Sequence, residues 1–426
     1  MTKLKWTGFA KKSPQERINL LKNASLLQTN NQENLDKQVE LPLDIANQMV
    51  ENVITKLALP LAIAPDFLVD GKTYHLPMVT EEPSVVAAAS FAAKLIKRSG
   101  GFTTTIHNRQ MIGQVALFDL HDFEEATTAI LHQKQLLISL ANQAHPSIVK
   151  RGGGARDLWL EQKEDFLIVY ISINTKEAMG ANIVNTMMEA LVPPLEKLSK
   201  GQALMAILSN YATESLVTAK CHLKLSSLSR NHDEAHLLAQ KLVKASQLAQ
   251  LDPYRASTHN KGIFNGIDAL VLATGNDWRA IEAGGHAYAA RDGQYRGLSQ
   301  WTYDQKTATI HGQLTLPMPI ATRGGSIGLN PTVTLAHDLL GNPNAKELAG
   351  LMTCLGLAQN FAALKALTST GIQAGHMKLQ AKSLALLAGA KEAEVGPLVQ
   401  KLLNEKHMNL ATAESLLNSL RNAKRS

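Results

Sequence analysis

The chain has 426 residues, of which 45% are hydrophobic and 19% charged, a composition that is typical of globular proteins and excludes a disordered chain. Its net charge of +7 suits an anionic ligand, but the basic residues are scattered and form no run of five, so nucleic acid is not the favoured partner. Cys221 and Cys354 stand far apart without zinc-like spacing, and no apolar stretch approaches roughly 18 residues, so we expect a cytoplasmic protein without disulfide, zinc or membrane span.

The first part of the chain predicts two helices and a hairpin. A capping box at residues 13–16, with proline at the first helical position, opens a helix. A second helix is expected over 42–54. Asp70-Gly71 then stands between two apolar runs, which is the signature of a tight hairpin.

An alanine-rich helix is expected to follow this hairpin. It begins at Pro83 and ends at Gly100-Gly101. Its alanines leave little bulk, so other elements can pack closely along it, which indicates a central helix. Glu82 therefore stands at the start of a buried helix. A role in catalysis and simple stabilisation by the helix dipole are equally good explanations from this segment alone.

Residues 109–209 predict a compact unit with the order β-α-β-β-α-β, the split pattern of ferredoxin-like folds. Its elements are expected at 113–120, 123–144, 155–162, 165–173, 178–198 and 203–210.

Two glycine-containing segments of this unit suit a phosphate or dinucleotide. Gly152-Gly153-Gly154 is flanked by Lys150 and Arg151, and Met179-Gly180 opens a helix. No GxGxxG fingerprint follows the first strand, so a Rossmann site is not predicted. A glycine triplet is more often a surface turn.

After residue 210 a strand and a helix return the chain to the first domain, so 109–209 is an insertion. The segment 252–279 then carries the densest set of reactive side chains, separated by three glycines and by the apolar run 269–273. We interpret it as the chemical centre, with a glycine-rich turn bearing solvated charges as the alternative. The reactive residues are Asp252, Arg255, His259, Lys261, Asp268, Asp277 and Arg279, and the glycines are Gly262, Gly266 and Gly275.

The rest of the chain predicts a helix from Asp277, a hairpin over 301–316, a glycine-rich loop and a long helical region that breaks near Gly371. Three short helices follow, separated at Gly389 and near His407. They could form a small mobile appendage with His376 at its root, although an isolated histidine is usually packed or solvated.

Four motifs, taken in order, resemble the catalytic positions of the 3-hydroxy-3-methylglutaryl-CoA (HMG-CoA) reductase family. They are Glu82 in TEEPSVVAAAS, Lys261 in DPYRASTHNKGIFNGID, Asp277 in ATGNDWRA and His376 in GIQAGHM. The resemblance runs from DIANQMVENVI through EAMGANIVNTMMEA to the C-terminus and points to the soluble bacterial type (class II). It implies an α/β (α+β) fold with a large, mostly helical CoA-ester-binding domain (1–108 and 210–372), a ferredoxin-like NAD(P)-binding insertion (109–209) and a helical C-terminal flap (373–426).

The resemblance also implies roles for these residues in reducing HMG-CoA to mevalonate and CoA. Lys261 holds the oxyanion, Asp277 pairs with Lys261, and Glu82 exchanges the proton in one coupled network. His376 on the flap protonates the CoA thiolate. By the same resemblance, Ser84, Arg255 and Asn265 hold the hydroxymethylglutaryl part, Glu177, Met179, Gly180, Asn182 and Asn210 lie near the nicotinamide cofactor, and the sites lie at a homodimer interface.

Two departures from the family pattern matter. His145 stands where NAD-preferring relatives have an aspartate that would repel a 2′-phosphate, and Lys150 and Arg151 follow closely. We therefore predict NADP(H) as the preferred cofactor, with NAD(H) possible and no metal. Thr55 replaces the usual glycine after ENVI and concerns only a local turn.

Two other functions remain open at this point. The first is the same chemistry in the degradative direction with NAD, and the second is a CoA-ester-binding protein without catalysis. An acyltransferase is less favoured, because neither cysteine lies in a motif that would activate its thiolate.

Overall fold

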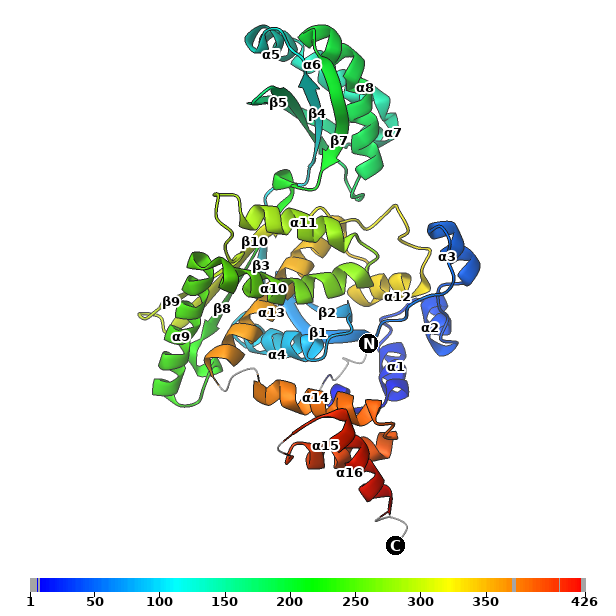
Figure 1. Cartoon of the computed structure of the whole chain (residues 1–426), viewed down its shortest axis with the longest axis vertical. Helices are drawn as coiled ribbons and strands as arrows, with labels where there is room; N and C mark the ends of the chain where they lie inside the picture. The colour runs from blue at the N-terminus through cyan, green and yellow to red at the C-terminus, as the bar shows by residue number, and fades with distance from the viewer. Residues whose placement is uncertain (1–5, 7, 370–372, 406, 423–426) are drawn as a thin grey trace.

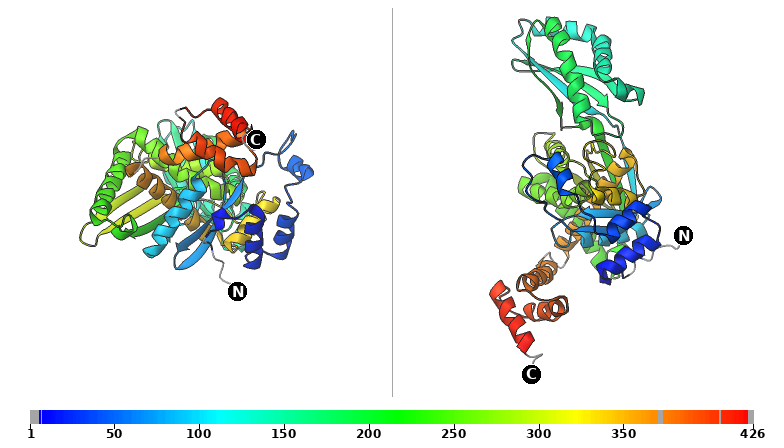
Figure 2. Two further views of the ribbon diagram at one scale, coloured as in Figure 1. Left: turned by 90° about the horizontal axis from the view of Figure 1, so that it is seen from below. Right: turned by 90° about the vertical axis from the view of Figure 1, so that its right-hand side faces the viewer.

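The computed structural model describes Trp6 and residues 8–369, 373–405 and 407–422. A sheet-and-helix unit stands at one end of an elongated molecule, a large domain occupies the middle, and a helical unit lies at the other end (Figures 1 and 2). Among the described residues, no helix is both long and apolar enough to cross a membrane.

The large domain is built on a six-stranded sheet with the order β2-β1-β3-β8-β10-β9. The predicted hairpin is confirmed, because Asp70 and Gly71 both have positive φ (47° and 81°) between β1 and β2. Strands β3 and β8 pair although the insertion separates them in sequence. The strands are β1 (Leu61–Val69), β2 (Lys72–Val79), β3 (Phe102–Ile106), β8 (Leu216–Lys224), β9 (Ser299–Asp304) and β10 (Thr309–Pro317).

Helix α13 (Ala345–Thr368) is the central helix of this domain, and it is buried on nearly every side. The alanine-rich α4 (Val85–Arg98) was expected to be central but has two faces: the helix packs against β1 and α13 with Ala89, Ala92 and Ala93 buried, while Phe91 is 44% exposed. It begins at Val85, two residues after the predicted start. The other helices here are α1 (Pro14–Asn23), α2 (Thr29–Asp36), α3 (Leu43–Met49), α9 (His232–Leu251), α10 (Pro253–Ala273), α11 (Trp278–Ala289) and α12 (Pro331–Leu340).

The predicted capping box of α1 is present, with Ser13 and Glu16 bonding each other's backbone N–H groups. The helix predicted over 42–54 is shorter, because Val50 already has extended backbone angles (φ −140°, ψ 145°) and ends α3.

The inserted unit has a four-stranded antiparallel sheet with the order β5-β6-β4-β7, which is the predicted split βαβ arrangement. The single helix expected over 123–144 is wrong: Gln133 (φ −98°, ψ 12°) divides it, and both halves pack against α8. The elements are β4 (Met111–Phe118), α5 (Phe123–His132), α6 (Lys134–Ala144), α7 (Pro146–Lys150), β5 (Gly154–Lys163), β6 (Phe166–Asn174), α8 (Ala181–Ser199) and β7 (Gln202–Ser209).

The C-terminal unit has three helices and a small core of its own, to which Ala381, Leu398 and Leu417 belong. Gly389 (φ 80°) separates the first two helices as predicted, whereas the break predicted at Gly371 lies outside the described residues. The helices are α14 (Gln373–Leu387), α15 (Glu392–Leu402) and α16 (Leu410–Asn422).

Candidate active site

The segment predicted as the chemical centre is mostly one uninterrupted helix, α10. Asp252 caps it by accepting hydrogen bonds from the backbone N–H groups of Tyr254 (3.3 Å) and Arg255 (3.0 Å), and Pro253 takes the first helical position. Gly275 (φ 69°) follows its end. The alternative of a glycine-rich turn is therefore wrong.

The two glycines inside α10 serve different purposes. A side chain at Gly266 would meet the backbone oxygen of Leu355 at 3.1 Å, so this glycine permits the close approach of α13. A side chain at Gly262 would meet nothing within 4 Å. Gly262 therefore leaves open space on the helix beside Lys261.

Lys261 lies on the solvent-facing side of α10 and pairs with Glu82, with 2.5 Å between Nζ and Oε2. Asn265, one turn further along, donates from Nδ2 to Oε1 of the same carboxylate at 3.4 Å. Glu82 and Lys261 are 179 residues apart in the sequence, and the fold brings their side chains into contact. The Glu82 carboxylate therefore lies in a cluster of polar side chains just before the start of α4.

Ser84 and Arg255 stand close in sequence to this cluster. Ser84 has a left-handed backbone (φ 75°, ψ −20°), which is uncommon for a non-glycine residue, and its hydroxyl does not cap α4. Burial lowers the pKa of the half-buried Arg255, which forms no ion pair within the described part of the chain. Both side chains are therefore free for a ligand.

Asp277 does not pair with Lys261 within the single chain, and because the sites are expected at a dimer interface, the predicted pairing stays a prediction. Asp277 caps α11 through the N–H groups of Arg279 (3.0 Å) and Ala280 (3.2 Å) and pairs with the Arg279 side chain at 3.4 Å. Asp277 follows the C-terminal end of α10 at Ala273. The twelve residues from Lys261 to that end span about 18 Å of helix, which separates Lys261 from Asp277 in the single chain.

A family model described as hydroxymethylglutaryl-coenzyme A reductase matches residues 13–381. The chain belongs to this family. Its fold agrees with that assignment, so it is an oxidoreductase that reduces HMG-CoA, and the predicted family, fold class and activity are confirmed.

Two curated relatives and two solved structures illustrate the similarity. The reductase of Archaeoglobus fulgidus is 41% identical over 424 residues, covering 97% of this chain and 94% of that protein, and the probable reductase of Borreliella burgdorferi is 33% identical, covering 82% and 80%. A reductase structure from Streptococcus pneumoniae is 61% identical with a TM-score of 0.86, covering 98% of this chain and 100% of that one. Another from that organism, described as class II and bound to NADPH in open conformations, is 60% identical with a TM-score of 0.85, covering 86% and 100%.

In this reductase the predicted cofactor residues of EAMGAN lie at the start of α8, as expected. Gly180 (φ 93°) caps that helix, and a side chain there would meet Thr175 at 2.3 Å, so only glycine fits. Met179 precedes it and Asn182 lies in the first turn. The backbone N–H groups of this turn are available to an anion. Asn210 follows β7, on the side of the insertion that faces α11.

Glu177 has a structural partner that the sequence did not indicate. Its carboxylate accepts hydrogen bonds from the Thr322 hydroxyl (2.6 Å) and the backbone N–H of Ala345 (2.8 Å). It therefore ties the insertion to the glycine-rich loop and to α13.

Arg109 was missed entirely. It is 7% exposed and donates to three backbone carbonyls, those of Lys176 (2.7 Å), Ala178 (3.1 Å) and Ile320 (2.6 Å). Burial lowers its pKa to about 10. It joins the loop between β6 and α8 to the large domain, and nothing in its local sequence distinguishes it from a solvated arginine.

His145, Lys150 and Arg151 surround the short helix α7 in the insertion. The His145 ring contacts the Ser147 hydroxyl (Nδ1 to Oγ, 3.2 Å), and Lys150 and Arg151 are exposed. Lys176 is a third basic residue near this loop, because its Nζ lies 3.4 Å from the position that a Cβ atom on Gly152 would take. The loop is therefore basic and open to solvent.

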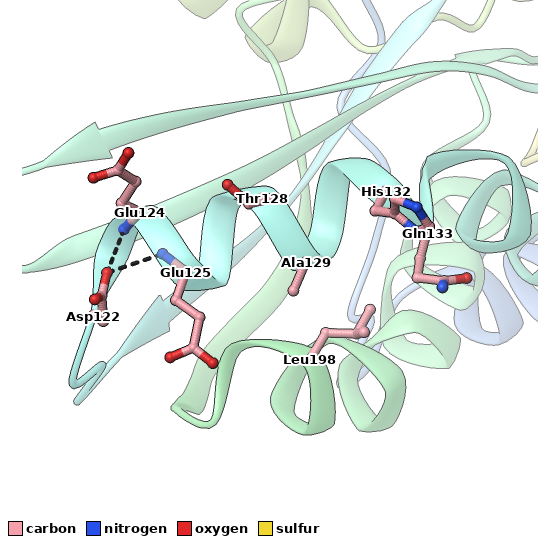
Figure 3. A pocket seen from close by; sticks show the side chains of 8 residues that line it. All are labelled: Asp122, Glu124, Glu125, Thr128, Ala129, His132, Gln133 and Leu198. Atoms are coloured by element: carbon pink, nitrogen blue, oxygen red, sulfur yellow. Dashed lines mark hydrogen bonds between the residues drawn. The ribbon is translucent and has the colours of Figure 1, made fainter.

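His376 belongs to α14, but its side chain lies outside the described residues. A shallow hollow of about 530 Å³ opens on the outer face of the insertion, between α5 and α8, and is lined by residues such as Glu125 and Leu198 (Figure 3). No predicted site residue lines it, so we do not assign it to catalysis.

Proposed function

We propose that the chain reduces (S)-3-hydroxy-3-methylglutaryl-CoA to (R)-mevalonate and CoA with two NADPH, in the mevalonate pathway of isoprenoid biosynthesis. The reaction takes place at Glu82, Lys261, Asp277 and His376. The observation that carries the assignment of these residues is the Lys261–Glu82–Asn265 cluster on an open helix face beside Gly262.

Each residue has a task in a reduction that passes through a hemithioacetal and an aldehyde. Bound NADPH supplies one hydride in each of the two reductions. The Lys261 ammonium stabilises the negative charge on the substrate oxygen, and Glu82 delivers the proton that this oxygen takes up. His376 on the flap protonates the departing CoA thiolate, so that two hydrides and two protons are consumed overall.

Ser84, Arg255 and Asn265 hold the hydroxymethylglutaryl part. The Arg255 guanidinium, which has no ion-pair partner among the described residues, suits the free carboxylate of the substrate, which it can bind through two parallel hydrogen bonds. The Ser84 hydroxyl and the Asn265 amide supply further hydrogen bonds close to Glu82.

We propose a homodimer in which Asp277 completes the site of the partner subunit. The distance along α10 supports this arrangement, because Asp277 lies beyond the far end of the helix that carries Lys261. An apolar segment supports it as well: Val50, Ile54 and Leu57 are 58%, 90% and 88% exposed in the single chain. Apolar groups of this size are rarely left in water together.

NADP(H) is the proposed cofactor. Lys150, Arg151 and Lys176 form a basic loop that can take a 2′-phosphate, and His145 lacks the negative charge that would repel it.

Replacing both Lys150 and Arg151 by alanine is expected to raise KM for NADPH about 10- to 100-fold. A loss of this size corresponds to one charge-assisted hydrogen bond between the basic loop and the 2′-phosphate of NADPH. KM for NADH should change little, because NADH has no 2′-phosphate, and Lys163→Ala on the same domain is the control. Initial rates with both cofactors check this, and a wild-type preference for NADH would contradict it and favour the degradative direction.

The remaining alternatives have direct tests. A purified protein that binds HMG-CoA but never oxidises NADPH would be a binding protein without catalysis. A cysteine-dependent acyltransferase is disfavoured, because Cys221 and Cys354 are both buried and burial raises the pKa of each thiol. Two buried free thiols suit a reducing compartment, and we propose the cytoplasm.

A further inference from the structure

A short segment of the large domain is bonded to the insertion at the loop that precedes α8. We call residues 320–323 the post-β10 segment and residues 176–180 the β6–α8 loop. The backbone carbonyl of Glu177 accepts hydrogen bonds from the N–H groups of Thr322 (2.9 Å) and Arg323 (3.2 Å). Together with the bond from the Thr322 hydroxyl to the Glu177 carboxylate (2.6 Å), these contacts fix the loop on the segment.

The buried side chain of Arg109 bridges the same two parts of the chain. Its Nη2 atom donates both to the Ala178 carbonyl of the β6–α8 loop (3.1 Å) and to the Ile320 carbonyl of the post-β10 segment (2.6 Å). Its Nε atom donates to the Lys176 carbonyl, also in the loop (2.7 Å). Because a guanidinium presents its donors in a fixed plane, it holds these backbone groups at set distances.

Asn276 bonds the post-β10 segment to the start of α11. Its Nδ2 atom donates to the Ala321 carbonyl (3.0 Å), and its Oδ1 atom accepts a hydrogen bond from the Ala321 N–H group (2.6 Å). Asn276 directly precedes Asp277, which caps α11. A continuous series of hydrogen bonds therefore runs from the β6–α8 loop, through the post-β10 segment, to the residue next to Asp277.

We propose that Arg109 and Asn276 are positioning residues that hold the β6–α8 loop and Asp277 together as one rigid unit. Both act through the post-β10 segment and not by touching the reacting atoms. The inference rests on the proposed function, in which this loop lies at the NADPH and Asp277 completes the site of the partner subunit. One chain then brings the nicotinamide and the Asp277 carboxylate together to a site that contains Lys261 of the partner subunit.

Arg109→Ala is expected to lower kcat/KM for NADPH about 10- to 100-fold, because a displacement of about 1 Å between reacting groups has an effect of this size. KM for HMG-CoA should change little, since the residues proposed to hold this substrate belong to α10 and the start of α4. Arg109→Lys keeps the charge but not the planar set of donors, so it should recover only part of the loss. Asn276→Ala should show the same pattern as Arg109→Ala, and the exposed Arg230→Ala is the control.

Mixed dimers distinguish positioning from a general loss of folding. When a Lys261→Ala chain pairs with an Asp277→Ala chain, the one intact site uses Asp277 and the β6–α8 loop of the Lys261→Ala chain. Such dimers can be isolated by giving the two chains different affinity tags. Adding Arg109→Ala to the Lys261→Ala chain should lower their NADPH oxidation about 10- to 100-fold, whereas adding it to the Asp277→Ala chain should leave the rate nearly unchanged.

Equal losses in the two placements, for both Arg109→Ala and Asn276→Ala, would overturn the proposal, because misfolding does not depend on which chain carries the change. Normal kcat/KM for NADPH in both single variants would overturn it as well. If the mixed dimers are inactive without either change, the proposed shared site fails instead. In that case a fluorescence titration with NADPH still tests Arg109, and binding weakened by Arg109→Ala but not by Arg230→Ala would support its role in positioning the loop.

Discussion

Replacing Lys261 by alanine is expected to lower kcat for NADPH oxidation with HMG-CoA about 100- to 1,000-fold. In the proposed mechanism the lysine supplies the positive charge beside the oxygen on which negative charge builds up, and removing one such group has an effect of this size. Its neighbours Glu82 and Asn265 remain in place, so the substrate still binds and KM should change far less than kcat. Absorbance of NADPH during steady-state turnover measures both parameters.

The matched control is Lys306→Ala, which removes an exposed lysine from the β9–β10 hairpin. It should have near wild-type activity. Lys261→Arg separates charge from shape, since a guanidinium keeps the charge but not the compact geometry, and it should recover only part of the loss. A Lys261→Ala variant with near-normal turnover would remove the lysine from the mechanism.

Replacing Glu82 by glutamine should lower kcat about 100- to 10,000-fold, because the amide cannot deliver a proton. It can still meet Lys261 and Asn265 through its oxygen and nitrogen, so the loss reflects proton transfer more than position. The neighbouring Glu81→Gln is the control, since Glu81 is exposed and has the same charge.

Steady-state rates and the thermal unfolding midpoint should be measured on both variants. Equal activity of Glu82→Gln and Glu81→Gln would exclude proton transfer by Glu82.

Local sequence was sufficient for much of the fold. The hairpin at Asp70-Gly71, the cap at Ser13 and the order of the inserted sheet all depend on neighbouring residues or regular periodicity. It was not sufficient for α10. Gly262 and Gly266 each cost a helix about 1 kcal/mol, but packing of α13 on Gly266 needs a small residue there and maintains the helix.

The site was predictable only in part, because its contacts are distant in sequence. Glu82 and Lys261 were identified through their motifs, and no periodicity could have placed them 2.5 Å apart. Arg109 and the Glu177 contacts join separate domains, so their partners are unknown until the chain is folded. The domain boundaries at 108/109, 209/210 and 372/373 remain predictions.

Asp277 shows the limit of reasoning from one chain. The resemblance paired it with Lys261, whereas in the single chain it caps α11 and pairs with Arg279. The proposed second subunit would account for this difference, so the proposed mechanism depends on the dimer.

Mixing two inactive variants tests this mechanism most directly. Lys261→Ala and Asp277→Ala should each be nearly inactive alone. Co-expressed in equal amounts, they should recover about a quarter of wild-type NADPH oxidation, because half of the randomly paired dimers would contain one intact site out of two. A mixture no more active than the separate variants would contradict a site shared between subunits.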